Sequence, residues 1–229
     1  MTYRYLLFDA DDTLFDFDQS SRRAFHIAMT ENGVTEQDGD YERYAAINLA
    51  LWKQFERGEI EKQEILTKRF RRYAEAYGIA CDPDAVNESY KLALCSQNIL
   101  MPSALDVIKT LHQKGFRLFI ITNGDANIQH RRLAGSPITP YIEKVFISEE
   151  IGYQKPSREF FDAVMTGIEG FEKEKALVIG DSETSDIKGA NNAGIDACYF
   201  SPMGAALPKG ITARYRISAL TDLYAILND

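Results

Sequence analysis

Three acids follow an apolar stretch near the start of the chain. Residues 5–8 read Tyr-Leu-Leu-Phe, and Asp9, Asp11 and Asp12 come directly after them. An apolar run that ends in acids predicts a buried strand with carboxylates at its carboxyl end, where ligands bind in open α/β sheets. Neighbouring carboxylates repel one another, so they need a bound cation or a protonated acid among them. Such a cluster is typical of magnesium-dependent phosphoryl transfer.

Three further segments place polar residues in a similar way. The residues Thr122-Asn123-Gly124 follow one apolar stretch, and Asp181 and Asp186 follow another. Lys155 lies between these segments, in a turn that ends in proline. Each segment alone is a weak signal, because an Asp after a strand often caps a helix and Thr-Asn-Gly often forms a turn. Their joint occurrence in this order predicts one site at the carboxyl edge of a sheet.

The elements that must position these residues change character along the chain. From residue 17 to residue 100 the apolar residues repeat at helical spacing, with turn signals that separate four helices. After residue 100, helices and short apolar strands alternate, which predicts a doubly wound parallel α/β sheet. We therefore expect an α/β core domain of residues 1–16 and 101–229, with an inserted all-helical domain of residues 17–100.

Composition excludes several classes of partner. The chain has 229 residues and a formal net charge of −8, which argues against a nucleic-acid polymer or an anionic membrane as the partner. Its three cysteines show no metal-ligand spacing, and we find neither a signal peptide nor a long apolar run. We expect a cytoplasmic monomer or small homo-oligomer that acts on a small molecule.

With these four segments the chain resembles the phosphatase branch of the haloacid dehalogenase (HAD) superfamily over essentially its whole length. That superfamily has an Asp-x-Asp-x-Thr motif, a strand that ends in Thr or Ser, a Lys, and a Gly-Asp followed by a second Asp. The matching residues here are Asp9–Thr13, Thr122, Lys155, Gly180-Asp181 and Asp186. The resemblance implies a Rossmann-like core, and the helical insertion resembles the small helical cap domain of one class.

Roles for the acids follow from what phosphoryl transfer requires, and the resemblance implies the same ones. Attack on a phosphate monoester needs a nucleophile, cations on the phosphoryl oxygens and a proton for the leaving group. Asp9 is the expected nucleophile, forming an aspartyl-phosphate, and Asp11 the expected general acid and then base. Mg²⁺ would be held by Asp9, the main-chain carbonyl of Asp11, and Asp181.

The remaining motif residues are expected to handle the phosphate group. Thr122 and the backbone N–H groups of Asn123 and Gly124 would hold phosphoryl oxygens, and Lys155 would neutralise their charge. Asp186 would orient a metal-bound water or Lys155. These assignments complete the predicted catalytic centre.

Three alternative functions share some of these residues. A receiver domain of a two-component system also uses acids, a Thr and a Lys, but it lacks the helical insertion and the segment from Gly180 to Asp186. A hydrolytic dehalogenase lacks the second acid, Asp11, because a halide leaves without a proton. A phosphohexomutase commonly has Gly where Asp12 stands. A phosphatase therefore agrees best with the sequence.

Substrate choice depends on the helical insertion. The Asp9–Asp16 opening, Trp52 and the segment Arg57-Gly58-Glu59-Ile60 resemble the bacterial nucleoside 5′-monophosphatases of this superfamily, which prefer pyrimidine nucleotides. Arg57 and Lys62 flank a turn and are our candidates for contact with the base or ribose. Phosphoglycolate and sugar phosphates stay open as alternative substrates.

Overall fold

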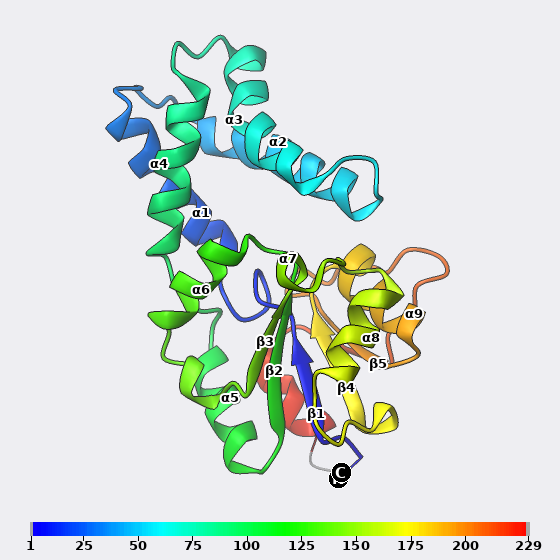
Figure 1. Ribbon diagram of the computed structural model, residues 1–229. Coiled ribbons are helices and arrows are strands. Elements are labelled where there is room, and N and C mark those ends of the chain that lie inside the picture. Colours follow the sequence, from blue (N-terminus) through cyan, green and yellow to red (C-terminus); the bar gives the residue numbers. More distant parts are fainter. Residues whose placement is uncertain (1, 228–229) are drawn as a thin grey trace. The chain divides into compact units, whose positions relative to one another are not determined.

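A computed structural model describes residues 2–227 (Figure 1). It divides into two compact units, one made of the chain up to Phe17 and from Ile99 onward, and the other of Asp18–Asn98. No helix in the described residues is long and apolar enough to cross a membrane. The catalytic motifs predicted from the sequence all fall in the first unit.

The first unit contains one parallel sheet with the strand order β3-β2-β1-β4-β5-β6. β1 lies in the middle, between β2 and β4. The strands β2 and β3 lie on one side of β1, and β4, β5 and β6 lie on the other, so the strand order reverses at β1. The predicted doubly wound α/β fold is confirmed. The strands are β1 (Tyr5–Phe8), β2 (Arg117–Thr122), β3 (Lys144–Ile147), β4 (Ala176–Gly180), β5 (Asp196–Phe200) and β6 (Tyr215–Ile217).

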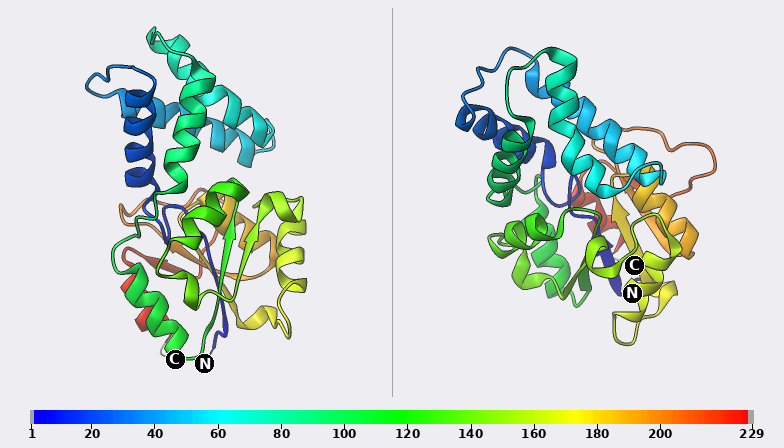
Figure 2. Two further views of the ribbon diagram at one scale, coloured as in Figure 1. Left: turned by 60° about the vertical axis from the view of Figure 1, so that its left-hand side comes forward. Right: turned by 45° about the horizontal axis from the view of Figure 1, so that its top comes forward.

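Helices cover both faces of the sheet because its strands are apolar on both sides. Leu6 and Phe8 of β1 pack on one face, and the alternate residues Tyr5 and Leu7 pack on the other. The turned view in Figure 2 shows α5 beside α10 on the first face. That face carries α5 (Ala104–Gln113), α6 (Ala126–Ala134) and α10 (Leu223–Ile226), and the second carries α8 (Arg158–Thr166) and α9 (Lys188–Ala193), with α7 (Ser148–Ile151) following β3.

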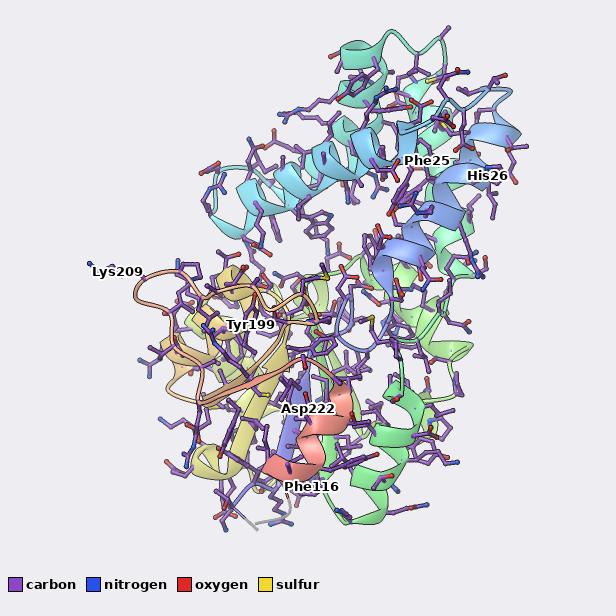
Figure 3. All side chains as sticks on the ribbon, turned by 180° about the vertical axis from the view of Figure 1, so that it is seen from behind. Phe25, His26, Phe116, Tyr199, Lys209 and Asp222 are labelled. Carbon is purple, nitrogen blue, oxygen red and sulfur yellow. The ribbon has the colours of Figure 1, made fainter. Side chains whose placement is uncertain are left out.

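The second unit is helical and has an aromatic core. Its helices are α1 (Phe17–Glu31, which begins at the last residue of the first unit), α2 (Asp40–Glu56), α3 (Lys62–Tyr77) and α4 (Pro83–Cys95). Phe25, labelled in Figure 3, packs against Tyr44 and Phe70, and the rings of Tyr44 and Phe70 stack with centroids 4.5 Å apart. These rings are buried, so they stabilise the unit and are not available to a ligand.

One predicted helix is interrupted. We expect a helix from Leu220 to Leu227, but the structure has a 3-10 turn at Leu220–Asp222 before α10. The reason is the carboxylate of Asp222, which accepts hydrogen bonds from the N–H groups of Ser218 and Ala219 and holds the turn.

Candidate active site

The carboxyl edge of the sheet gathers the predicted motifs. Asp9 follows β1, Thr122 ends β2 and Asp181 follows β4, and these are three adjacent strands. The register aligns Phe8 with Ile120 on one side and with Ile179 on the other, and the Asp9 N–H donates to the Ile179 carbonyl at 2.8 Å. The topology therefore places the site where the order of the strands reverses, as expected for open α/β sheets.

Lys155 lies at the centre of the site and is 1% exposed. Its ammonium nitrogen donates to Asp9 Oδ1 at 2.5 Å, Asp186 Oδ1 at 2.7 Å and the Ile121 carbonyl oxygen at 2.9 Å. Burial disfavours the charged form, but the carboxylates of Asp186 and Asp9 raise the pKa of Lys155. Its three N–H bonds thus all have acceptors, and the side chain is a fixed cation.

Asp186 is held at both carboxylate oxygens. Oδ1 accepts from Lys155, and Oδ2 accepts from the Ser182 N–H at 3.0 Å. Gly180 makes room for this carboxylate, because a Cβ at that position would lie 2.3 Å from Asp186 Oδ2. The Gly-Asp sequence at the end of β4 therefore has two roles: Gly180 leaves space for the Asp186 carboxylate, and Asp181 is one of the predicted site acids.

Three carboxylates come close enough to share a cation. Oxygens of Asp9, Asp181 and Asp186 lie within 4.8 Å of one another. Burial and the neighbouring carboxylates raise the pKa of Asp9 and of Asp181 well above the ordinary value. If all three carboxylates are ionised, they and the Lys155 ammonium group together carry a net charge of −2. A divalent cation would balance that charge. The all-oxygen donor set suits Mg²⁺ or Ca²⁺.

Asp11 is bound by two side chains of α6. Its Oδ1 forms an ion pair with Arg132 Nη1, and its Oδ2 accepts from Gln129 Nε2 at 2.6 Å. Gln129 Nε2 also lies 3.3 Å from Thr122 Oγ1. The predicted acid and the predicted phosphate ligand are therefore joined through one amide group.

The segment after β2 forms a turn that supports its neighbours. The Gly124 N–H donates to Thr122 Oγ1 at 3.0 Å, so the hydroxyl group keeps its own proton for donation. The Asn123 side chain pairs with the backbone of Lys155, accepting from its N–H and donating to its carbonyl oxygen, each at 2.9 Å. Asn123 thereby ties the Lys155 loop to the end of β2.

Comparisons with known proteins decide the family. The family model of the haloacid dehalogenase-like hydrolases matches residues 3–194. This chain belongs to that family. It is 37% identical to the HAD-hydrolase YfnB of Bacillus subtilis over 99% of this chain and 96% of YfnB. It is 40% identical to the pyrimidine 5′-nucleotidase PynA of Streptococcus pneumoniae over 88% of this chain and 85% of PynA.

Solved structures agree with this assignment. The crystal structure of YfnB bound to magnesium, for which interdomain movement is described, superposes with a TM-score of 0.94 at 36% identity and full coverage of both chains. The L-2-haloacid dehalogenase RSc1362 shares the fold, with a TM-score of 0.83 at 15% identity and full coverage of both chains. Membership of the HAD-like hydrolases, predicted from the motifs, is confirmed.

Two residues that contact this hydrolase site were not singled out from its sequence. Gln129 and Arg132 lie three residues apart on α6, which places both on one face of the helix. One feature of the sequence could have indicated that α6 begins beside the site. Asp125 caps α6 directly after the Thr-Asn-Gly segment. Nothing in the sequence indicated that this face would meet Asp11.

Asp12 has a structural contact in this member of the family. It adopts a φ of 60°, in the left-handed region that is uncommon for residues other than glycine. Its Oδ1 accepts from the Phe17 N–H at 3.1 Å, at the start of α1. The side chain therefore stabilises the turn that follows the two predicted catalytic acids.

Arg57 and Lys62, the predicted specificity residues, belong to the second unit. They flank the turn between α2 and α3. The guanidinium of Arg57 forms two hydrogen bonds with the Glu59 carboxylate, at 2.5 and 2.9 Å, and the pair is exposed. A substrate contact by Arg57 would have to compete with that pairing, and the role of both residues stays a prediction.

Proposed function

We propose that this protein is a Mg²⁺-dependent phosphomonoester hydrolase that acts through an aspartyl-phosphate and prefers pyrimidine nucleoside 5′-monophosphates. The observation that carries the reaction type is the presence of two acids with separate partners, Asp9 on Lys155 and Asp11 on Gln129 and Arg132. A nucleophile and a proton donor that are held independently are what an ester with a poor leaving group requires.

The substrate class rests on the relatives. PynA and the E. coli protein YjjG, which is 30% identical over 99% of both chains, are both named pyrimidine 5′-nucleotidases. Relatives at 27% and 29% identity are named ribulose-1,5-bisphosphate 5-phosphatase and glyceraldehyde 3-phosphate phosphatase. Greater identity to the nucleotidases favours a nucleotide, and a sugar phosphate is the alternative that the assay must test.

In the first step, a carboxylate oxygen of Asp9 attacks phosphorus. A bond forms between that oxygen and phosphorus, the bond from phosphorus to the ester oxygen breaks, and Asp11 gives its proton to the leaving oxygen. Lys155 fixes the rotamer of Asp9 through Oδ1 and compensates negative charge. Thr122 donates its hydroxyl proton to a phosphoryl oxygen.

In the second step, water attacks the aspartyl-phosphate. Asp11 takes a proton from that water, the bond between phosphorus and the Asp9 oxygen breaks, and inorganic phosphate leaves. Asp9 returns to a carboxylate and Asp11 to a protonated acid, so both are ready for another cycle. The insertion of residues 18–98 is our candidate cap, which would select the leaving group.

The magnesium site would use the oxygen donors at the carboxyl edge. Asp9, Asp181 and the main-chain carbonyl of Asp11 would hold the ion, and Asp186 would support the site through Lys155 and Ser182. When bound, Mg²⁺ supplies charge compensation for the phosphoryl oxygens. The fit rests on the donor set, because carboxylate oxygens of Asp9, Asp181 and Asp186 lie within 4.8 Å of one another and oxygen is the donor that Mg²⁺ prefers.

A panel of phosphate esters assayed with Mg²⁺ tests the proposal. It should contain pyrimidine and purine nucleoside 5′-monophosphates with their deoxy forms, phosphoglycolate, hexose phosphates, glyceraldehyde 3-phosphate and p-nitrophenyl phosphate. We expect the highest kcat/KM for a pyrimidine nucleotide. A sugar phosphate or phosphoglycolate that exceeds every nucleotide by about tenfold, or 1.4 kcal/mol, would refute the substrate assignment and leave the phosphatase assignment standing.

Variants of the turn between α2 and α3 test specificity separately. Arg57→Met and Lys62→Met should change the preference between nucleotides more than they change hydrolysis of p-nitrophenyl phosphate. Arg71→Met is the matched control, because Arg71 is also an exposed arginine of the second unit paired with an acid, Asp84.

Two further expectations from the sequence concern the whole protein. Its cytoplasmic location and its monomeric or small oligomeric state stay predictions.

A further inference from the structure

We propose that Arg132 is a positioning residue for Asp11, and that Gln129 is an exchangeable partner whose place the leaving oxygen of the substrate takes. The inference rests on the proposed phosphatase function, in which Asp11 transfers the proton. In the structure both oxygens of Asp11 already accept hydrogen bonds from α6. A leaving oxygen that approaches Asp11 from the side of α6 would replace one of these contacts.

The surroundings of Arg132 hold its side chain in one position. Its side chain is fully buried, and its guanidinium carbon lies 4.6 Å from the centre of the Phe15 ring. Phe15 is fixed in turn, because its N–H donates to the Ala10 carbonyl at 2.8 Å and its carbonyl accepts from the Asp12 N–H at 2.7 Å. The ring that supports Arg132 thus belongs to the same turn that carries Asp11.

Charge also favours Arg132 as the contact that persists. The guanidinium of Arg132 adds charge attraction to its hydrogen bond with the carboxylate, and breaking a buried ion pair costs more than breaking an exposed one. Gln129 offers Asp11 a neutral amide. When one oxygen of Asp11 is released, Oδ2 is therefore the one released.

Gln129 lies on the side of Asp11 where a phosphate is expected. Its Nε2 is 2.6 Å from Asp11 Oδ2 and 3.3 Å from Thr122 Oγ1. Oδ2 therefore faces the hydroxyl group that would hold a phosphoryl oxygen, whereas Oδ1 faces Arg132. Proton transfer is thus assigned to Oδ2.

The Gln129 side chain is enclosed but incompletely satisfied. It is 1% exposed, and among the described residues its Oε1 has no hydrogen-bond partner. A buried amide oxygen without a partner is costly, which offsets part of what the Nε2 contacts contribute. Gly124 leaves space for the amide, since a Cβ there would lie 2.2 Å from Gln129 Nε2.

The experiment measures single-turnover phosphorylation of the full-length protein in Mg²⁺ with two esters. One is the best alkyl phosphate of the panel, whose leaving group needs a proton, and the other is p-nitrophenyl phosphate, whose leaving group does not. For Arg132→Met we expect a loss of about thirtyfold or more with the alkyl ester and less than about fivefold with the aryl ester. For Gln129→Met we expect a loss that is smaller than that of Arg132→Met with the alkyl ester and that does not depend on the leaving group.

A double variant shows whether Arg132 acts through Asp11. In an Asp11→Asn background, Arg132→Met should change the alkyl-ester rate by less than about twofold, because two residues that act as a unit are not additive. Arg131→Met is the control. Arg131 is the exposed neighbour on α6 and bonds Asn127, so wild-type rates are expected with both esters.

Three outcomes would overturn the inference: equal losses with both esters, a loss that persists in the Asp11→Asn background, or a loss for Gln129→Met as large as that for Arg132→Met. If Arg132→Met does not fold, Arg132→Lys keeps the charge without the planar fork and should show the same dependence on the leaving group at smaller size. A wild-type protein that forms no aspartyl-phosphate with any ester would refute the proposed function instead.

Discussion

The ammonium nitrogen of Lys155 lies 2.5 Å from Oδ1 of Asp9, and both side chains are buried at the carboxyl edge of the sheet. Asp9 and Lys155 are 146 residues apart in sequence. The contact forms because Lys155 lies in the connection that leads from β3, at the edge of the sheet, back to β4, next to β1. The pair fixes the orientation of the expected nucleophile. It also makes the stability of the core depend on a residue of the site.

Lys155→Met should destabilise the protein as well as inactivate it. The change leaves the carboxylates of Asp9 and Asp186 buried without their shared cation, and breaking a buried ion pair costs about 3–5 kcal/mol. Urea unfolding at neutral pH measures the loss. Lys144→Met is the control, because Lys144 is exposed and donates to the Gly167 carbonyl, and its stability should stay near wild type. Equal stabilities of the two variants would contradict the arrangement.

Asp9→Asn should abolish turnover and keep the fold. The substitution removes the attacking charge and one expected metal ligand while preserving the shape of the side chain. Lys155 keeps Asp186 as its ion-pair partner in this variant, and burial raises the pKa of Asp9, so we expect a Tm close to that of the wild type. Steady-state kinetics with thermal unfolding checks both statements. Retention of about a tenth of wild-type kcat, a barrier change of only about 1.4 kcal/mol, would rule out Asp9 as the nucleophile.

Magnesium should stabilise the protein as well as activate it. Chelation should remove activity, Mg²⁺ should restore it, and Ca²⁺ should inhibit because its larger and less regular coordination shell misplaces the reacting groups. A ligand at about 100 times its Kd adds about 2.7 kcal/mol of stability, which a thermal shift detects. Asp181→Asn should lose most of that shift. Full activity in excess chelator, or an undiminished shift in Asp181→Asn, would contradict the assigned site.

Cys198 should resist alkylation in the native protein. Burial raises the pKa of its thiol from 9.0 to about 12, and the side chain is inaccessible, whereas Cys81 is partly exposed. At pH 8 a thiol reagent should modify Cys81 and leave Cys198 unmodified, as peptide mass spectrometry would show. Rapid modification of native Cys198 would be inconsistent with this core.

The same pKa shift predicts a loss of stability at high pH. A raised pKa in the folded state means that the unfolded chain loses the thiol proton first. The contribution is therefore complete below pH 9 and falls as the pH rises toward 12. Cys198→Ala should show a shallower decline than the wild type in urea unfolding between pH 8 and 11. Parallel declines would argue against the shift.

The sequence by itself determined the fold class, the family and the position of the catalytic motifs along the chain. Apolar strands with Asp9, Thr122 and Asp181 at or just after their carboxyl ends specify a parallel sheet with polar residues at one edge, because the carboxyl ends of parallel strands lie together. Helical periodicity located the four helices of the insertion, since their buried faces repeat with the period of the helix. These are local patterns that can be recognised without a partner.

Only the tertiary structure decided which side chains meet. It showed that the Asn123 amide holds the backbone of Lys155, that the Gly124 N–H serves Thr122, and that Gln129 and Arg132 hold Asp11. The Gly124 contact is local, but the others join segments whose separation in the chain carries no information about their distance in space. A buried arginine in a helix looks like a surface residue in a sequence, because its environment is set by the turn that packs against it and not by its neighbours along the chain.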